Sequence, residues 1–388
     1  MTLARRHRWS TVALSIVAVA ALASCSLAEG SDSAEEIEDG SPVYFGVSSA
    51  TTGQYAEYGE QFRLAFDLAV EEINAAGGID GHPIELKYED SQSDPKQSVT
   101  VAQKFVADSD VILVFGDYSS AASIPASPIY TDGELLQYGF NNSNPAFTED
   151  GTQWQWSSAT TTKANYTWTA NYIKELGVDS VAVTYLNTAD WGIPAFDAFE
   201  EEAERVGLEI TAAEGIDATS DDYRPSLTKA VEGDPEAFVH VGYGPDAAKL
   251  VSQLRAIGYE GTFFGGQDEA SFNSTPEAEG AVIPSQFVET SDDPLVQDFV
   301  ASFLEKYPQE DDVTLFEAIA YDALYVAAAA AEAGGLTREG ILAGFEEIAD
   351  VPSVIYGSIT FDQETRRVAD PTLTPTTLKD GTWTVYEG

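Results

Sequence analysis

The chain has 388 residues, which favours about two domains, and its 44% hydrophobic and 22% charged residues are typical of a globular protein. Its 65 acidic residues outnumber the 19 Lys and Arg and give a formal charge of -46, which argues against nonspecific binding to nucleic acid. One cysteine excludes an internal disulfide and a thiolate-rich metal site, and three histidines offer little material for a histidine metal centre.

The first residues have the pattern of an export signal. Three arginines within the first eight residues precede an apolar run over 11–23, which is too short to span a bilayer. The run ends in LASC at 22–25, which resembles a bacterial lipobox and holds the single cysteine of the chain. In signals of that kind the peptide is cut before the cysteine, whose sulfur takes a diacylglycerol. The alternative is an ordinary signal peptide with an incidental Cys25.

We therefore predict a lipoprotein signal peptide over 1–24, with Cys25 as the lipidated residue, and an acidic tether over 25–41. The tether is rich in Ser, Asp, Glu and Gly, which is typical of a solvated linker. The predicted location is extracytoplasmic, with the lipid anchoring the protein to the outer face of the cell membrane.

The first part of the globule alternates strands and helices. Short apolar or alternating runs predict strands at 43–47, 84–88 and 111–115. Between the first two, apolar residues recur at helical spacing from Phe62 to Ile73, and a glycine pair ends that helix. Asp94 followed by Pro95 predicts the N-cap and first turn of the next helix.

The pattern then restarts, which predicts two doubly wound α/β units in series. The second unit is predicted to contain a helix at 166–176, a strand at 180–186, a helix from Pro194 to Gly207, a strand at 208–212, a strand at 238–241 and a helix from Pro245. Two further helices are expected at 295–307 and 315–333, and the chain is expected to end with a strand pair formed by 358–361 and 382–386.

Several motifs, in the same order along the chain, resemble the leucine/isoleucine/valine-binding protein family, the type I solute receptors of ABC importers. They are GQYAEYG at 53–59, VEEINAAGGI at 70–79, DSQSDP at 90–95, NPAFT at 144–148 and GYGPD at 242–246. The resemblance runs from about Val43 to the C-terminus.

This resemblance implies two α/β lobes joined by a three-segment hinge, with a solute trapped between the lobes and an ABC permease as membrane partner. The N-terminal lobe is expected to take 42–159 and 286–368, and the C-terminal lobe 160–285 and 369–388. A monomer is expected, with no cofactor and no metal. A sensory module that reports a solute without transporting it is the alternative from another class.

The sequence itself points to a binding site after the strand at 111–115. Gly116 to Ser120 follow that strand and precede a helix expected near Ala121. Ligands bind at such carboxyl-end turns in open α/β folds, and the free N–H groups of a helix start attract an anion. Ser119 or Ser120 adds a hydroxyl donor. The resemblance implies that Ser120 binds a carboxylate and that Tyr118 lines the side-chain pocket; the alternative is that Ser120 is only an N-cap.

Other site residues follow from the resemblance. Asn141 and Ser143 match positions that supply a backbone carbonyl and a hydroxyl, although Asn-rich loops also serve turns. Tyr58 and Trp191 match aromatic walls, and Tyr243 has a similar place after the strand at 238–241.

The sequence departs from the family at 265–269, where amino-acid-binding members place an acid that neutralises the ammonium of the solute. Here the matching residue is Gln267, and the adjacent Asp268 faces the solute only if the loop shifts by one residue. An ammonium opposite an amide is poorly compensated. The solute is therefore either a branched-chain or other amino acid, or an amide, urea or an aromatic acid, and the sequence leaves these alternatives open.

No catalytic constellation is visible. The sequence contains no G-x-S-x-G, Walker A or Rossmann glycine motif. His240 alternates with Phe238 along a predicted strand and is interpreted as an interior histidine with its hydrogen bonds satisfied. We therefore expect a binding protein and not an enzyme.

Overall fold

The structure is a computed structural model that describes residues 40–53, 55–188, 191–265, 270–272, 274–369 and 371–386. Its main elements are two sheets, of five and seven strands, each covered by helices on both faces. We call the five-stranded sheet with its helices the first lobe and the seven-stranded sheet with its helices the second lobe. The doubly wound α/β fold predicted from the sequence is confirmed.

The sheet of the first lobe is entirely parallel and has the order β2-β1-β3-β4-β5. Every residue of β3 is buried, as its continuous apolar sequence requires in a sheet covered on both faces. The strands are β1 (Val43–Ser49), β2 (Ile84–Asp90), β3 (Val111–Gly116), β4 (Leu136–Tyr138) and β5 (Gln155–Trp156).

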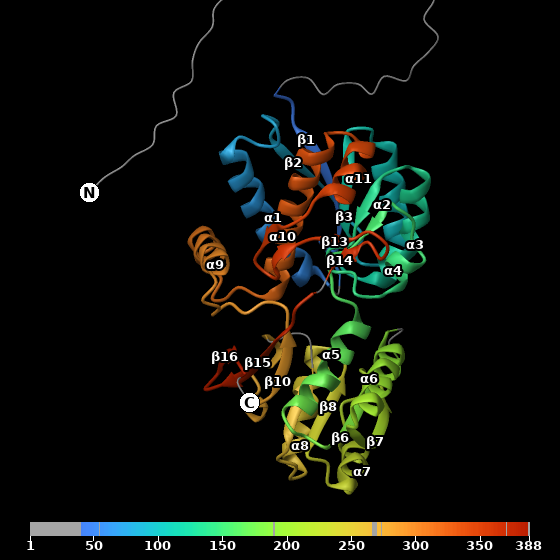
Figure 1. Cartoon of the computed structure of the whole chain (residues 1–388), viewed down its shortest axis with the longest axis vertical. Helices are drawn as coiled ribbons and strands as arrows, with labels where there is room; N and C mark the ends of the chain where they lie inside the picture. Colours follow the sequence, from blue (N-terminus) through green and yellow to red (C-terminus); the bar gives the residue numbers. More distant parts are fainter. Residues whose placement is uncertain are drawn as a thin grey trace, which may run out of the picture. The chain divides into compact units, whose positions relative to one another are not determined.

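The helices of the first lobe come from both ends of the chain. In Figure 1 the blue α1 and the orange α10 lie side by side although more than two hundred residues separate them. The predicted cap of α2 is confirmed, since the Asp94 side chain accepts the amides of Lys96 and Gln97. The helices are α1 (Ala56–Ala76), α2 (Pro95–Ala107), α3 (Ser120–Asp132), α4 (Ala146–Glu149), α9 (Pro294–Lys306), α10 (Leu315–Gly334) and α11 (Arg338–Glu347).

The sheet of the second lobe has the order β16-β15-β10-β9-β8-β6-β7. It is parallel from β7 to β10, and β15 and β16 continue it as an antiparallel edge. Its elements are α5 (Thr162–Glu175), β6 (Ser180–Leu186), α6 (Gly192–Val206), β7 (Glu209–Ile216), α7 (Arg224–Ala230), β8 (Ala237–Val241), α8 (Gly244–Ala256), β9 (Thr262–Gly265), β10 (Val282–Ser285), β15 (Thr374–Lys379) and β16 (Thr382–Val385), with short 3-10 turns at 231–233, 270–272 and 276–278.

The expected strand pair at the end of the chain is wrong. The first expected strand, 358–361, does not pair with the second. Its residues belong to two small sheets, β11 (Val351–Ser353) with β12 (Gly357–Ile359) and β13 (Phe361–Asp362) with β14 (Arg367–Val368). The last strand, β16, pairs with β15 through a turn at Asp380 and Gly381, which both have positive φ. An Asp-Gly pair favours such a two-residue hairpin, so β16 pairs with the strand directly before it and not with the more distant residues 358–361.

Three helices, α4, α7 and α11, were not predicted, and α6 begins before Pro194, at Gly192. The chain passes between the two lobes three times, over 157–161, 286–293 and 369–373, of which residue 370 lies outside the described residues. We call these the first, second and third crossing segments. The exact domain boundaries given above stay a prediction. Within the part of the chain that the structure describes, no helix combines the length and apolar character needed to cross a membrane.

Candidate functional site

An aromatic cluster lies where α1 begins and β3 ends. The rings of Tyr58 and Tyr118 stack with centroids 4.6 Å apart and an interplanar angle of 7°. Tyr55 lies 5.2 Å from Tyr118, and Phe316 of α10 lies 4.7 Å from Tyr58. The two tyrosines predicted to line the site are therefore brought together, and Tyr55 and Phe316 are additional members that the sequence patterns did not reveal.

Burial raises the pKa of Tyr118 well above its usual value, and the neighbouring phenols of Tyr58 and Tyr243 raise it further. The ring is therefore neutral at any physiological pH. Because Tyr58 belongs to the first lobe and Tyr243 to the second, the electrostatic environment of Tyr118 includes residues of both lobes. Tyr118 is thus a neutral, largely buried phenol whose ring stacks on Tyr58.

The start of α3 lies next to this cluster. Ser119, and not Ser120, is the N-cap, and its side chain accepts the amide of Ala122. The alternative reading of Ser120 as an N-cap is therefore wrong, and the helix begins one residue before the expected Ala121. The Ser120 hydroxyl accepts the amide of Asn144 at 3.3 Å. The first amides of a helix have no intrahelical acceptor, so this end of α3 is suited to an anionic oxygen.

The loop after β4 completes the first-lobe part of the site. We call residues 141–144 the Asn loop. The Asn141 side-chain amide donates to the Tyr118 carbonyl at 3.4 Å, and the Ser143 carbonyl accepts the amide of Thr162 at the start of α5. Both predicted residues thus lie in one loop that contacts the turn after β3, and Ser143 also contacts the second-lobe helix α5. Their contacts with a solute stay a prediction.

Sequence reasoning missed Asp117, a buried carboxyl group between the predicted site residues and the sheet. The hydroxyls of Ser48, Ser93 and Ser98 donate to its two oxygens at 3.2, 2.5 and 3.3 Å. Burial raises its pKa, while hydrogen bonds from serines oppose that rise. The only signal in the sequence was the position of this acidic residue, directly after the wholly apolar strand β3.

The turn after β3 is thereby fixed to four other segments. Asp117 receives serine hydroxyls from β1, from the loop after β2 and from α2, and its carbonyl accepts the Asn142 side-chain amide at 3.1 Å. Hydrogen-bonded buried polar groups favour one conformation, and in this network only Asn142 Oδ1 has no partner among the described atoms. The backbone that presents Tyr118 and Ser120 is therefore held in place before any ligand arrives.

In the second lobe, Trp191 and Tyr243 are in contact. Their rings meet edge to face with centroids 5.0 Å apart, and the Trp191 indole N–H donates to the Tyr243 hydroxyl at 2.6 Å. Each residue directly precedes a helix, α6 or α8, at the carboxyl end of its strand. Tyr243 is 43% exposed, so one large aromatic surface of this lobe faces outward.

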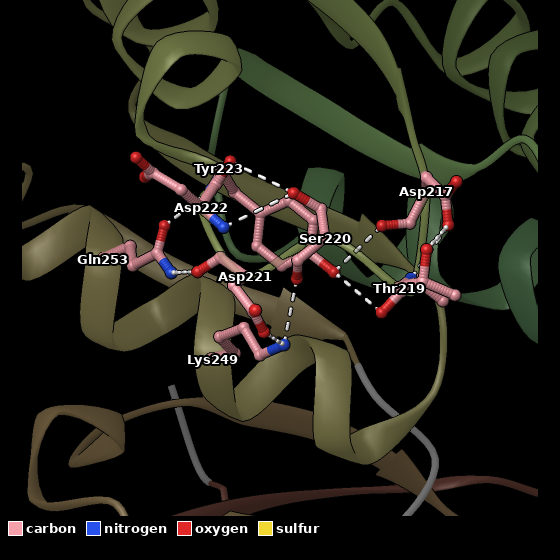
Figure 2. Close-up of polar contacts among 9 residues, drawn as sticks. Asp217, Thr219, Ser220, Asp221, Asp222, Tyr223, Lys249 and Gln253 are labelled. Atoms are coloured by element: carbon pink, nitrogen blue, oxygen red, sulfur yellow. Dashed lines mark hydrogen bonds and ion pairs between the residues drawn. The ribbon is translucent and has the colours of Figure 1, made fainter.

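The neighbouring loop after β7, residues 217–223, is held against α8 (Figure 2). Lys249 donates to the Ser220 carbonyl at 2.9 Å, and Gln253 donates to the Asp221 carbonyl at 3.0 Å while accepting the Tyr223 amide. Its three acidic side chains interact with Thr219, Arg224 and Lys249. These contacts attach the loop to α8.

Three predicted residues, Cys25, Gln267 and Asp268, lie outside the described residues. The described part of the chain also contains no group of three or more His, Cys, Asp or Glu that could hold a metal ion. The described residues of this candidate site carry hydroxyls, amides, aromatic rings and the buried carboxyl group of Asp117.

Comparison with known proteins gives a family match over most of the chain. Residues 42–382 match the periplasmic binding protein family. The chain is 26% identical over 325 residues to Leu/Ile/Val-binding protein homolog 1 of Brucella abortus, which covers 83% of this chain and 86% of that protein.

Solved structures agree with this match. A putative branched-chain amino acid ABC transporter protein from Rhodospirillum rubrum is 29% identical with a TM-score of 0.75, covering 89% of this chain and all (100%) of that one. The substrate binding protein LivJ from Streptococcus pneumoniae, solved in complex with isoleucine, is 25% identical with a TM-score of 0.78, covering 88% and 97%.

Proposed function

Because the chain belongs to the periplasmic binding protein family, we propose that it captures a small solute by closure of its two lobes and delivers it to the permease of an ABC importer. Its extracytoplasmic location follows from that family. Its relatives are binding proteins of transporters, so the prediction that it is not an enzyme is confirmed. Lipidation of Cys25 and action as a monomer are further parts of the proposal.

The observation that carries the proposal is the pairing of two complementary surfaces in the first lobe. The start of α3, with Ser120, suits a carboxylate or amide oxygen, and the adjacent stack of Tyr58 on Tyr118 suits an apolar or aromatic tail. Trp191 and Tyr243 supply a second aromatic surface from the other lobe. The proposed solute therefore has an oxygen-bearing head and a compact uncharged tail.

Two classes of solute fit that description. A branched-chain or other amino acid requires a group for its ammonium, which Asp268 would supply, whereas an amide, urea or aromatic acid is compatible with Gln267 at that place. The protein of Streptococcus pneumoniae was solved with isoleucine, which supports the first class. Variants distinguish the two: Asp268→Asn weakens binding of an amino acid and leaves binding of an amide or aromatic acid unchanged.

A thermal-shift screen of amino acids, short amides, urea and aromatic acids tests the proposal. A solute that binds the folded form alone stabilises it by about 2.7 kcal/mol at one hundred times its Kd. We expect a rise in Tm with at least one member of the panel. A panel in which no member changes Tm, repeated calorimetrically at millimolar solute with the same result, contradicts the proposed function.

Replacement of Ser120 by alanine is expected to weaken binding of the identified solute about ten- to a hundredfold. The hydroxyl is a hydrogen-bond donor to a charged oxygen, an interaction worth roughly 1.5–3 kcal/mol. Titration calorimetry measures the change. Asp132→Ala is the control, because it alters an exposed residue at the opposite end of α3 and is expected to leave the affinity unchanged. Equal affinities of Ser120→Ala and the wild type would remove Ser120 from the site.

A further inference from the structure

Arg367 is a buried cation at the junction of the first lobe with the crossing segments. It lies in β14, two residues before the third crossing segment begins, and is 8% exposed. Its backbone pairs with Ser157, the first residue of the first crossing segment. The side chain therefore lies where two of the three connections between the lobes meet.

The guanidinium group uses its donors on neutral acceptors from separate segments. Nη1 donates to the Asn142 and Ala159 carbonyls, both at 3.0 Å, and to the Ser157 hydroxyl at 3.3 Å. Nη2 donates to the Asn144 carbonyl at 2.8 Å, and Nε donates to the Thr148 hydroxyl at 2.9 Å. The planar fork thus joins the Asn loop to the first crossing segment.

The charge of Arg367 is not neutralised by an ion pair, since none of the salt bridges between described residues includes it. Burial lowers its pKa to about 10, so the group remains charged at neutral pH. A buried cation without its acceptors is strongly destabilised. The acceptor carbonyls and the arginine therefore hold each other in one arrangement, which a lysine with a single ammonium cannot reproduce.

The Asn loop connects this cation to the solute site. Asn144 accepts from Arg367 through its carbonyl and donates to the Ser120 hydroxyl through its amide, at 2.8 and 3.3 Å. Asn142 accepts from Arg367 and donates through its side chain to the Asp117 carbonyl. Two hydrogen-bonded paths therefore run from Arg367 to the turn that carries Tyr118 and Ser120, each through one residue of the Asn loop.

We propose that Arg367 is a positioning residue for solute binding, which fixes the Asn loop and the Ser120 hydroxyl against the segments that connect the lobes. The inference rests on the proposed function. In this proposal Arg367 lies outside the solute site but aligns the Ser120 hydroxyl that would contact the solute oxygen. Arg367 also connects that hydroxyl to the first crossing segment.

Arg367→Lys tests this role, with Arg366→Lys as the matched control. Arg366 is the neighbouring arginine, and its side chain donates to carbonyls of Gln155, Glu364, Gly151 and Thr148 but not to the Asn loop or Ala159. We expect Arg367→Lys to weaken binding of the solute found in the screen by about tenfold or more, and Arg366→Lys to leave the affinity unchanged. Equal affinity of folded Arg367→Lys and the wild type overturns the inference.

A double-mutant cycle separates positioning from a general structural role. If Arg367 acts through Ser120, Arg367→Lys has a much smaller effect on affinity in the Ser120→Ala background than in the wild type. If the effects of Arg367→Lys and Ser120→Ala on affinity are fully additive, the inference is contradicted. A loss of Tm without a loss of affinity in the folded protein contradicts it as well.

A milder variant covers the case in which Arg367→Lys does not fold. Thr148→Val removes the acceptor of Nε and leaves the guanidinium in place. It is expected to weaken binding in the same direction, non-additively with Ser120→Ala, and an unchanged affinity counts against the inference. Failure of the wild type to bind any solute is a separate result, which contradicts the proposed function and therefore the inference with it.

Discussion

Between pH 6.5 and 3 the wild-type protein is expected to lose stability that the His240→Asn variant retains. His240 lies in β8 and is completely buried, with Nδ1 3.0 Å from the Thr184 hydroxyl. Its Nε2 has no hydrogen-bond partner among the described atoms. The interior histidine predicted from the alternation along the strand is therefore confirmed, but only one of its two nitrogens is satisfied.

Burial lowers the pKa of His240 from 6.5 to about 3, because desolvation disfavours the charged form of the ring. A folded-state pKa below the unfolded value means that the unfolded chain binds the proton more tightly. The stabilisation is therefore complete above pH 6.5 and is lost as the pH falls towards 3, with a total on the order of 5 kcal/mol.

Urea unfolding at pH 7, 5.5 and 4 gives the difference in unfolding free energy between the wild type and His240→Asn. The contributions of the many acidic groups that both proteins share cancel in this difference. Asparagine places an amide near the position of Nδ1 and keeps a contact with Thr184 without titrating. Thr184→Val is the control, since it leaves the buried ring in place and is expected to show the wild-type dependence on pH. Parallel stability curves for the wild type and His240→Asn contradict this account of His240.

Gly59→Ala is expected to destabilise the protein by roughly 3 kcal/mol or more, as substitutions that force backbone apart do. Gly59 is buried in the first turn of α1, and a Cβ atom at this position would overlap the carbonyl of Ala50 after β1. That turn carries Tyr58 and directly follows Tyr55, so displacement of the helix also disturbs the tyrosine stack.

The midpoint of urea unfolding and the affinity for the identified solute measure the two consequences of Gly59→Ala. Glu57→Ala is the control, because Glu57 is exposed on the same turn. We expect the control to change the free energy of unfolding by less than about 0.5 kcal/mol. A Gly59→Ala variant as stable as this control would show that the helix moves aside without cost.

Those features that depend on neighbouring residues could be predicted from the sequence. The cap of α2 by Asp94 and the buried strand β3 follow from short patterns. The same holds for the turn that carries Tyr118, Ser119 and Ser120, because the apolar strand before it and the helix start after it can both be recognised in the sequence. The stacking partner Tyr58 came from the family resemblance, since no local pattern connects it with Tyr118.

The features that were missed depend on contacts between distant segments. The carboxyl group of Asp117 takes its donors from serines 19 to 69 residues away, and Arg367 takes its acceptors more than 200 residues away. Neither position carries a periodic signal, so only the folded structure reveals the partners. The hairpin at Asp380-Gly381 is a different case: its turn signal was present in the sequence, but the strand before it was not predicted.

Hydrogen exchange with and without the solute found in the screen tests most directly whether both lobes take part in binding. We predict slower exchange in peptides that cover 118–123 and 141–144 of the first lobe and, in the same sample, in peptides that cover 191–195 and 243–247 of the second lobe. Slower exchange in only one of the two lobes, or only in segments remote from these loops, would contradict capture of the solute by both.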